Sequence, residues 1–236
     1  GRSQVSIGIP VGTNVASLGA DTGLAYSHVV VYARNGDGQQ AVPSAGALSD
    51  ADATAASVAL HDEDIDNTEI GGHVTWSPPG DMSAVAHYAV YLGDDAAGST
   101  RSQLGGLVQV GTNNLFFPAD TSRLGWNNVL VYTKSALAEQ TTPASGPMVD
   151  AVAIITSMAF IDKDLDATEL GGYVSWSVSG PGLAVTTNFN VYFAMTSNGN
   201  GKQLLGSVPV GTNQLLVGPE VVQGNLLYVL VFIESA

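Results

Sequence analysis

The feature that most constrains this chain is an internal repeat with a period of about 100 residues. The tetrapeptide Val-Gly-Thr-Asn occurs three times, at residues 11–14, 110–113 and 210–213. Apolar runs ending in Tyr or Phe recur in the same register at residues 29–32, 129–132 and 229–232. Self-similarity at a fixed period indicates modules arranged in series. We therefore expect a tandem array of similar modules.

The register of the repeat divides the 236 residues into three modules or parts of modules. Residues 57–150 form one complete module, residues 157–236 form a second that lacks its final strand, and residues 1–50 are the rear half of another. Neither end matches a module boundary, so we expect an incomplete stretch of a longer chain. The joints at 51–56 and 151–156 contain no glycine or proline, which favours packing of their apolar residues between modules.

Within the complete module, apolar and polar residues alternate with the period of two that is typical of half-buried strands. Val74 and Trp76 share one face of such a segment, which ends at the turn signal Pro-Pro-Gly-Asp of residues 78–81. Later strands are expected at residues 107–110, 114–117, 128–135 and 140–142. About seven short strands in about 95 residues predict an all-β fold of tandem two-sheet antiparallel β-sandwiches, nearly free of helix. The Gly-Thr-Asn segments are predicted to be tight hairpin turns with glycine at positive φ.

The three tryptophans are expected to have two different roles. Trp76 and Trp176 are equivalent in the repeat and lie on alternating apolar faces, so both are predicted to anchor a core. Trp126 has Tyr26 and Leu226 at its equivalent positions. That variation makes Trp126 a weak candidate for contact with a carbohydrate or a protein.

The complete module resembles fibronectin type III domains in its second and third expected strands. Residues 73–79 read His-Val-Thr-Trp-Ser-Pro-Pro, and residues 85–91 read Val-Ala-His-Tyr-Ala-Val-Tyr. In that family, a strand B tryptophan precedes Ser-Pro-Pro and a Tyr-x-Val of strand C packs beside it. Residues 172–176 and 189–192 repeat the theme. The family's strand F tyrosine is not evident at residues 124–128, which leaves an immunoglobulin-like sandwich as the alternative.

A longer phrase, Asp-x-Asp-x-Asp-x-x-Glu followed by Leu or Ile and Gly-Gly, precedes the tryptophan in both modules. Together with the later Val-Gly-Thr-Asn, it is similar to repeats in very long surface proteins of microalgae. That resemblance implies an extracellular fibre, a flagellar hair or an adhesive coat, and hence an extracellular or cell-surface location. It implies no site residues.

The charge of the chain limits its partners. A net charge of −14, from 7 basic and 21 acidic residues, repels nucleic acid and favours cations, calcium above all. No apolar run reaches the roughly 18 to 20 residues of a membrane helix, so we expect no membrane span in this stretch. The chain has no cysteine, which removes disulfides and thiolate metal sites.

The acidic phrase is the sharpest candidate site, because hard calcium ions bind several oxygen ligands on a short flexible loop. The candidate ligands are Asp62, Asp64, Asp66, Glu69, Asp162, Asp164, Asp166 and Glu169. An EF-hand is excluded, since the sixth position is not glycine and the glutamate comes at position eight. The alternative is a solvated loop that keeps the molecule soluble and discourages edge pairing. Asp50 and Asp150, which precede the joints, either add ligands or form turns, and the turn role is favoured.

No catalytic constellation recurs between the modules. The four histidines, at positions 28, 61, 73 and 87, have no histidine at an equivalent position, and no nucleophile elbow or phosphate loop is present. We therefore expect a non-enzyme: a structural strut or filament that contacts neighbouring repeats and other copies. The alternatives are a calcium-dependent adhesin or carbohydrate-binding module with glycan partners, and a non-catalytic appendage of an enzyme. The sequence has no Asn-x-Ser/Thr glycosylation signal.

Overall fold

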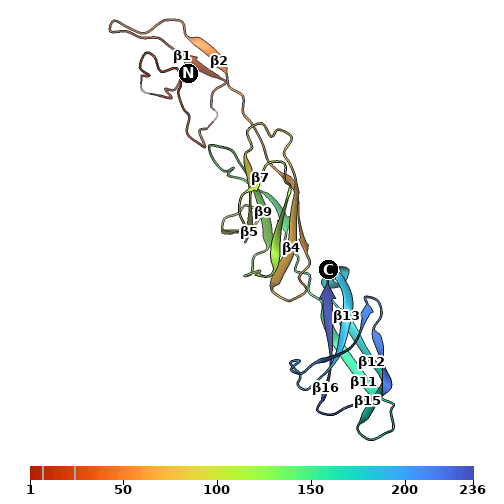
Figure 1. The fold of residues 1–236 in the computed structure, drawn as a ribbon. Helices are drawn as coiled ribbons and strands as arrows, with labels where there is room; N and C mark the ends of the chain where they lie inside the picture. The colour runs from red at the N-terminus through yellow and green to blue at the C-terminus, as the bar shows by residue number, and fades with distance from the viewer. Residues whose placement is uncertain (7, 24) are drawn as a thin grey trace.

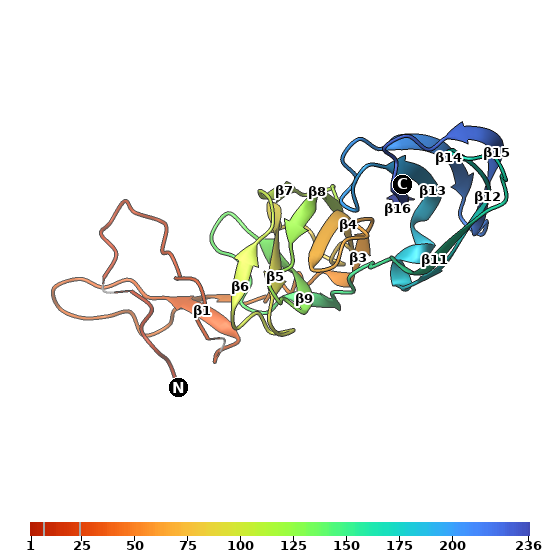
Figure 2. The ribbon, with the colours of Figure 1, turned by 90° about the horizontal axis from the view of Figure 1, so that it is seen from below.

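The computed structural model describes residues 1–6, 8–23 and 25–236 of the chain. Three parts follow one another in a row: an open N-terminal segment, a first β-sandwich and a second β-sandwich (Figures 1 and 2). The row persists when the molecule is turned by 90°, so the described chain is elongated.

The first sandwich has two antiparallel sheets with strand orders β3-β4-β8 and β10-β9-β5-β6, and β7 pairs beside β5. The first sheet consists of β3 (Ala56–Asp62), β4 (Glu69–Ser77) and β8 (Asn114–Ser122). The second consists of β5 (His87–Gly93), β6 (Arg101–Gln103), β7 (Val108–Gln109), β9 (Asn128–Lys134) and β10 (Ala144–Pro147). This arrangement confirms the predicted all-β, fibronectin type III-like sandwich.

The second sandwich repeats the first along the chain, with strand orders β11-β12-β15 and β14-β13-β16. Its first sheet consists of β11 (Ile154–Asp162), β12 (Glu169–Ser179) and β15 (Gln214–Val222). Its second consists of β13 (Thr186–Ala194), β14 (Gln203–Pro209) and β16 (Tyr228–Ser235). A single turn of 3₁₀ helix, η1 (Pro181–Ala184), is the only helix among the described residues.

The N-terminal segment contains one hairpin, β1 (His28–Val31) with β2 (Ser44–Ala47). Its register pairs Val30 with Ala45, just as β9 pairs Leu130 with Ser145 in the first sandwich. All residues of the two strands are exposed. The N-terminal hairpin thus has the pairing of the last two strands of a sandwich, while the module boundaries themselves stay predictions.

Two separate hydrophobic cores fill the sandwiches, each organised around one tryptophan. Trp76 and Trp176 are each only 5% exposed, which confirms their predicted burial. Trp76 meets Tyr88 edge-on at a ring distance of 5.2 Å, and Trp176 meets Phe189 in the same way at 5.5 Å. Aromatic pairs with this geometry add about 0.5–1.5 kcal/mol beyond the burial of their area.

The Gly-Thr-Asn segments form tight turns, as expected, but the turns are not hairpins. Residues 110–113 join β7, which pairs with β5, to β8, which pairs with β4 in the other sheet. Gly111 and Gly211 have φ values of 93° and 91°, which side-chain-bearing residues rarely adopt. In the first sandwich, Thr112 N–H donates to the Gln109 carbonyl at 3.1 Å, closing a turn with glycine at its third position. A type II turn requires this placement of glycine.

Two sequence-based expectations of secondary structure were wrong in detail. The last strand, expected at residues 140–142, lies at Ala144–Pro147. A bend precedes it, because Pro143 has no N–H to donate to a ladder and Glu139 already bridges Lys134. The expected joint at 151–156 is shorter as well, because β11 begins at Ile154 and takes up its second half.

Candidate functional site at the joint between sandwiches

The first acidic loop, residues 62–69, connects β3 to β4 at the end of the first sandwich that faces the second (Figure 1). Asp62 is buried, with 7% of its surface exposed. Its Oδ1 accepts hydrogen bonds from the N–H groups of Gly71 at 2.9 Å and Asp64 at 3.2 Å. Its Oδ2 accepts one from Ala151 N–H at 2.9 Å. Asp62 therefore holds the loop closed and also reaches the chain that leaves the sandwich.

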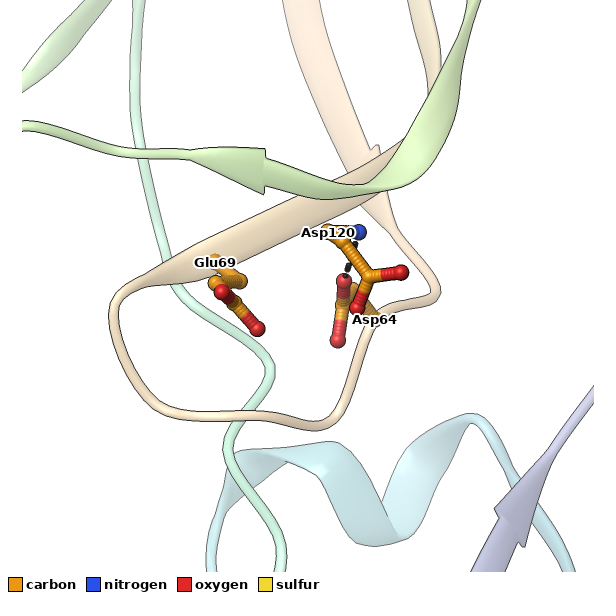
Figure 3. Close-up of side chains that lie close together, drawn as sticks. All are labelled: Asp64, Glu69 and Asp120. Carbon is orange, nitrogen blue, oxygen red and sulfur yellow. Dashed lines mark hydrogen bonds between the residues drawn. The ribbon is translucent and has the colours of Figure 1, made fainter.

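The Asp64 side chain connects the first acidic loop to β8, the neighbour of β4. Its Oδ1 accepts a hydrogen bond from Asp66 N–H at 3.0 Å, and its Oδ2 accepts one from Asp120 N–H at 2.7 Å. The carboxylates of Asp64, Glu69 and Asp120 converge, with oxygens within 4.8 Å of one another (Figure 3). Of the four candidate ligands named from the sequence, Asp62 and Asp66 lie outside this group, and Asp120 was missed.

The second acidic loop, residues 162–169, has the same local geometry in the second sandwich. Asp162 Oδ1 accepts hydrogen bonds from Asp164 N–H at 3.0 Å and Gly171 N–H at 2.9 Å. Asp164 accepts one from Glu220 N–H at 2.8 Å, the counterpart of Asp120 in the first sandwich. Here the converging carboxylates are those of Asp164, Asp166 and Glu169, again within 4.8 Å.

Like charges shape the electrostatics of both groups. The pKa of Glu69 is raised from its ordinary value of 4.5 by desolvation and by the charges of Asp120, Asp64 and Asp66. The pKa of Glu169 is raised mainly by the charge of Glu220. Three carboxylates this close form an oxygen-rich group that can ligate a hard divalent cation.

The linker, residues 150–153, binds the first acidic loop through the Asp150 side chain and through its own backbone. Asp150 Oδ2 accepts a hydrogen bond from Thr68 N–H at 3.0 Å and lies 3.7 Å from the Arg123 guanidinium. Ala153 N–H donates to the Ile65 carbonyl at 3.1 Å. Asp150 thus clamps two segments 82 residues apart, a different role from the turn favoured by the sequence.

The second sandwich holds the same linker from the other side. Gly182, in η1, donates its N–H to the Val152 carbonyl at 3.0 Å. A side chain on Gly182 would overlap the carbonyl oxygen of Ala151, and one on Gly180 would overlap that of Val152. Both glycines are needed because the backbones approach too closely for a Cβ. The linker is therefore packed between the two sandwiches.

A cleft of about 460 Å³ lies between the first sandwich and the C-terminal end of the second. The first acidic loop and Phe116 of β8 line one side, and the end of β16 from Ile233 onward lines the other. The two sandwiches thus approach each other over more than the linker alone.

Asp50, the repeat equivalent of Asp150, is exposed and forms no hydrogen bond with the described residues. Nearby, the Thr54 hydroxyl donates to Asp52 at 2.9 Å. Trp126, the candidate for a carbohydrate or protein contact, is partly buried and packs against the first core. The position of Trp126 therefore does not favour a sugar platform.

A second recurring cluster, missed from the sequence, lies on the sheet of β5 and β9. The Arg101 guanidinium stacks 4.5 Å from the centre of the Tyr91 ring and 4.1 Å from that of Tyr132. The Arg101 guanidinium also forms an ion pair with the Glu139 carboxylate at 2.9 Å. The same carboxylate accepts a hydrogen bond from the Tyr91 hydroxyl, also at 2.9 Å. Cation–π contacts of this kind contribute about 0.5–2 kcal/mol.

The same cluster recurs in the other two parts of the chain. Lys202 lies over the rings of Tyr192 at 4.8 Å and Phe232 at 4.3 Å. Arg2 lies over Tyr32 at 5.0 Å. Three of the chain's seven basic residues thus occupy one repeated position. The matching Arg-Ser-Gln tripeptides at 2–4 and 101–103 are the sequence signal that could have revealed it.

The histidines do not share a common site: His28 and His61 are exposed, and His73 and His87 are half-buried on different sheets. His61 and His73 are opposite each other on β3 and β4, and His61 Nε2 is 3.0 Å from the Thr75 hydroxyl. His87 pairs with Gln109 at 3.0 Å. Among the described residues, no helix has the length and hydropathy needed to cross a bilayer.

Comparison with models of known protein families finds no match, and no curated protein matches the sequence. A search of solved structures finds the crystal structure of the FN1-FN3 domains of chicken CNTN1. The two are 12% identical with a TM-score of 0.31, and the match covers 89% of this chain and 78% of that one. The assignment of the fold therefore depends on the strand order described above.

Proposed function

We propose that this chain is a strut region of an extracellular or cell-surface protein, whose function is to hold successive sandwiches at a fixed angle. The observation that carries the proposal is the linker, which is hydrogen-bonded to both sandwiches at once. Ala151 bonds to Asp62 of the first sandwich, and the Val152 carbonyl bonds to Gly182 of the second. A flexible tether would leave these backbone groups to water.

The small size of the linker side chains supports the proposal. Ala151 and Ala153 are 8% and 9% exposed, so they are buried like core residues although they lie between two folded units. Larger residues would push the sandwiches apart, whereas glycine would allow the linker to bend. Alanine at both positions suits a joint that is short and stiff.

The same joint geometry in every repeat would produce a rod. No sheet is shared between the two sandwiches, and the sandwiches follow one another in a row (Figures 1 and 2). At about 3.3 Å per residue, a strand of about ten residues gives each unit roughly 30 Å of length. A long array of such units reaches far from a surface with one repeated design.

Imaging of the longer natural array tests the strut proposal. The expected image is a stiff rod whose periodicity matches the length of one sandwich plus its linker. A string of particles with uncorrelated orientations would contradict it.

A second candidate function, a calcium-dependent adhesin, is supported by the converging carboxylates of Asp64, Glu69 and Asp120 and by their counterparts in the second sandwich. Binding of calcium to the folded state alone would raise the melting temperature with calcium concentration. Thermal unfolding in calcium and in chelator, with magnesium as the matched ion, tests this candidate. Identical melting temperatures in all three would contradict this candidate.

A further inference from the structure

The two acidic loops have the same local fold, but among the described residues only the first loop binds a linker. Thr68 and Thr168 have φ values of 72° and 73°, and Asp62 and Asp162 each close their own loop through Oδ1. The first loop also presents three groups to the linker: the Asp62 Oδ2, the Ile65 carbonyl and the Thr68 N–H. We call these three groups the first socket.

The corresponding second socket consists of the Asp162 Oδ2, the Leu165 carbonyl and the Thr168 N–H. In the part of the chain that the structure describes, these three groups form no hydrogen bond. Leu165 is 97% exposed, whereas Ile65 is partly buried. The chain therefore contains one occupied and one open copy of the same site.

The occupant of the first socket has a simple sequence pattern, Asp-Ala-x-Ala. Its aspartate accepts the Thr68 N–H, its first alanine donates to Asp62, and its second alanine donates to the Ile65 carbonyl. The third position can vary because it contributes its carbonyl to Gly182. The same pattern occurs at residues 50–53 and 150–153, once before each sandwich.

We infer that the second socket is a docking site for an Asp-Ala-x-Ala strip that leads into another sandwich of this repeat. The inference rests on the proposed strut function and adds the site and the partner through which it acts. The main role of the acidic loop is then to bind the backbone of the next linker. Alternate aspartates are needed because one closes the loop while the next fastens it to the neighbouring strand.

The Asp62→Asn substitution separates the two duties of that carboxylate. The amide side chain would keep an oxygen for the N–H groups of Gly71 and Asp64, but would turn its nitrogen toward Ala151 N–H. Two facing donors cannot bond, so we expect hydrogen exchange at the Ala151 amide to speed up by about tenfold or more. Asp162→Asn is the matched control, because the same change there breaks no contact with a linker.

An extended chain tests the open socket directly. Because Ala236 aligns with Ala136, adding a second copy of residues 137–236 after Ala236 continues the repeat in register. We expect the amides of Ala151 and Ala153, which are hydrogen-bonded, and the amides of their added copies to be equally protected from hydrogen exchange. In the extended chain, Asp162→Asn should remove that protection at the added copy of Ala151.

The outcomes separate the inference from the function on which it rests. If the added strip exchanges like an unstructured peptide while scattering shows a stiff rod, the socket is wrong and the strut stands. If protection and stiffness are both absent, the strut proposal fails as well. Protection that appears only with calcium and disappears with chelator would overturn the socket in favour of a cation site.

Discussion

At the scale of single residues, Asp62 shows how a candidate metal ligand can instead organise the backbone. Each of its oxygens accepts hydrogen bonds from backbone N–H groups, and it lies outside the group of converging carboxylates. Burial raises its pKa, although its three N–H donors oppose that rise. A buried carboxylate with this many backbone partners is part of the fold whether or not an ion binds beside it.

The Asp62→Ala substitution should therefore be costly. It leaves the N–H groups of Gly71 and Ala151 without acceptors, and each buried unpaired group costs about 1–3 kcal/mol. We expect denaturant unfolding of the first sandwich to shift to lower denaturant by a matching amount. Asp66→Ala, at an exposed position of the same loop, should change the free energy of unfolding much less. Equal effects of the two variants would contradict this role of Asp62.

The pH dependence of stability should report the pair formed by Glu169 and Glu220. The pKa of Glu169 is raised in the folded state, so the folded state holds its proton more tightly than the unfolded state does. Its stabilising contribution is full below the ordinary pKa of 4.5 and is lost as the pH rises through the raised value. We expect Glu169→Gln to flatten the decline in melting temperature just above pH 4.5.

Two further variants check that assignment. Glu220→Gln removes the charge that raises the pKa of Glu169, so it should flatten the same part of the pH profile. Asp37→Asn makes the same change in net charge in the N-terminal segment, away from the pair, and should leave the profile as it was. A flattened profile in Asp37→Asn would show that net charge alone is responsible.

At the scale of elements, period-two patterning was enough to predict the sandwich but not its details. Val74 and Trp76 face the core as expected, because alternation alone decides which side of a strand is buried. The last strand was misplaced, because Pro143 forces a bend that hydrophobic patterning does not register. The conformation between β9 and β10 depends on which backbone N–H groups are free to pair with a neighbouring strand. The sequence does not show that pairing.

The candidate site was predictable only in part, for a similar reason. The acidic phrase marked the correct loops, since its spacing and repetition are visible in the sequence. Asp120 joins the first group from β8, 56 residues from Asp64, and local spacing gives no sign of that contact. An acidic residue at the repeat-equivalent position, Glu220, was the one available signal.

The element that the second sandwich contributes to the joint is η1. Alanine at Gly182 would place a methyl group against the Ala151 carbonyl oxygen, so η1 or the linker must move. We expect Gly182→Ala to weaken the joint, seen as faster hydrogen exchange at the amides of positions 182 and 153, with the core around Trp176 unchanged. Gly80→Ala is the control, since no atom outside its neighbours lies within 4 Å of the added methyl group. Unchanged exchange in Gly182→Ala would show that the close approach does not hold the joint.

At the scale of the whole molecule, repetition and joint geometry act together. The cation–π contacts recur at one position in all three parts, so three of the seven basic residues have the same structural role. The linker is hydrogen-bonded to the sandwiches on both sides, and in the proposed strut these bonds fix the orientation of one sandwich relative to the next. In the proposed strut, the net charge of −14 would make neighbouring copies repel one another.

Residual dipolar couplings of the whole chain in weak alignment test the central claim, a fixed orientation between the two sandwiches, most directly. Couplings from residues 56–147 and from residues 154–235 are each fitted to an alignment tensor. A fixed joint gives two tensors of the same magnitude and orientation. Tensors that differ in magnitude or direction would show that the sandwiches reorient independently, and would contradict the strut.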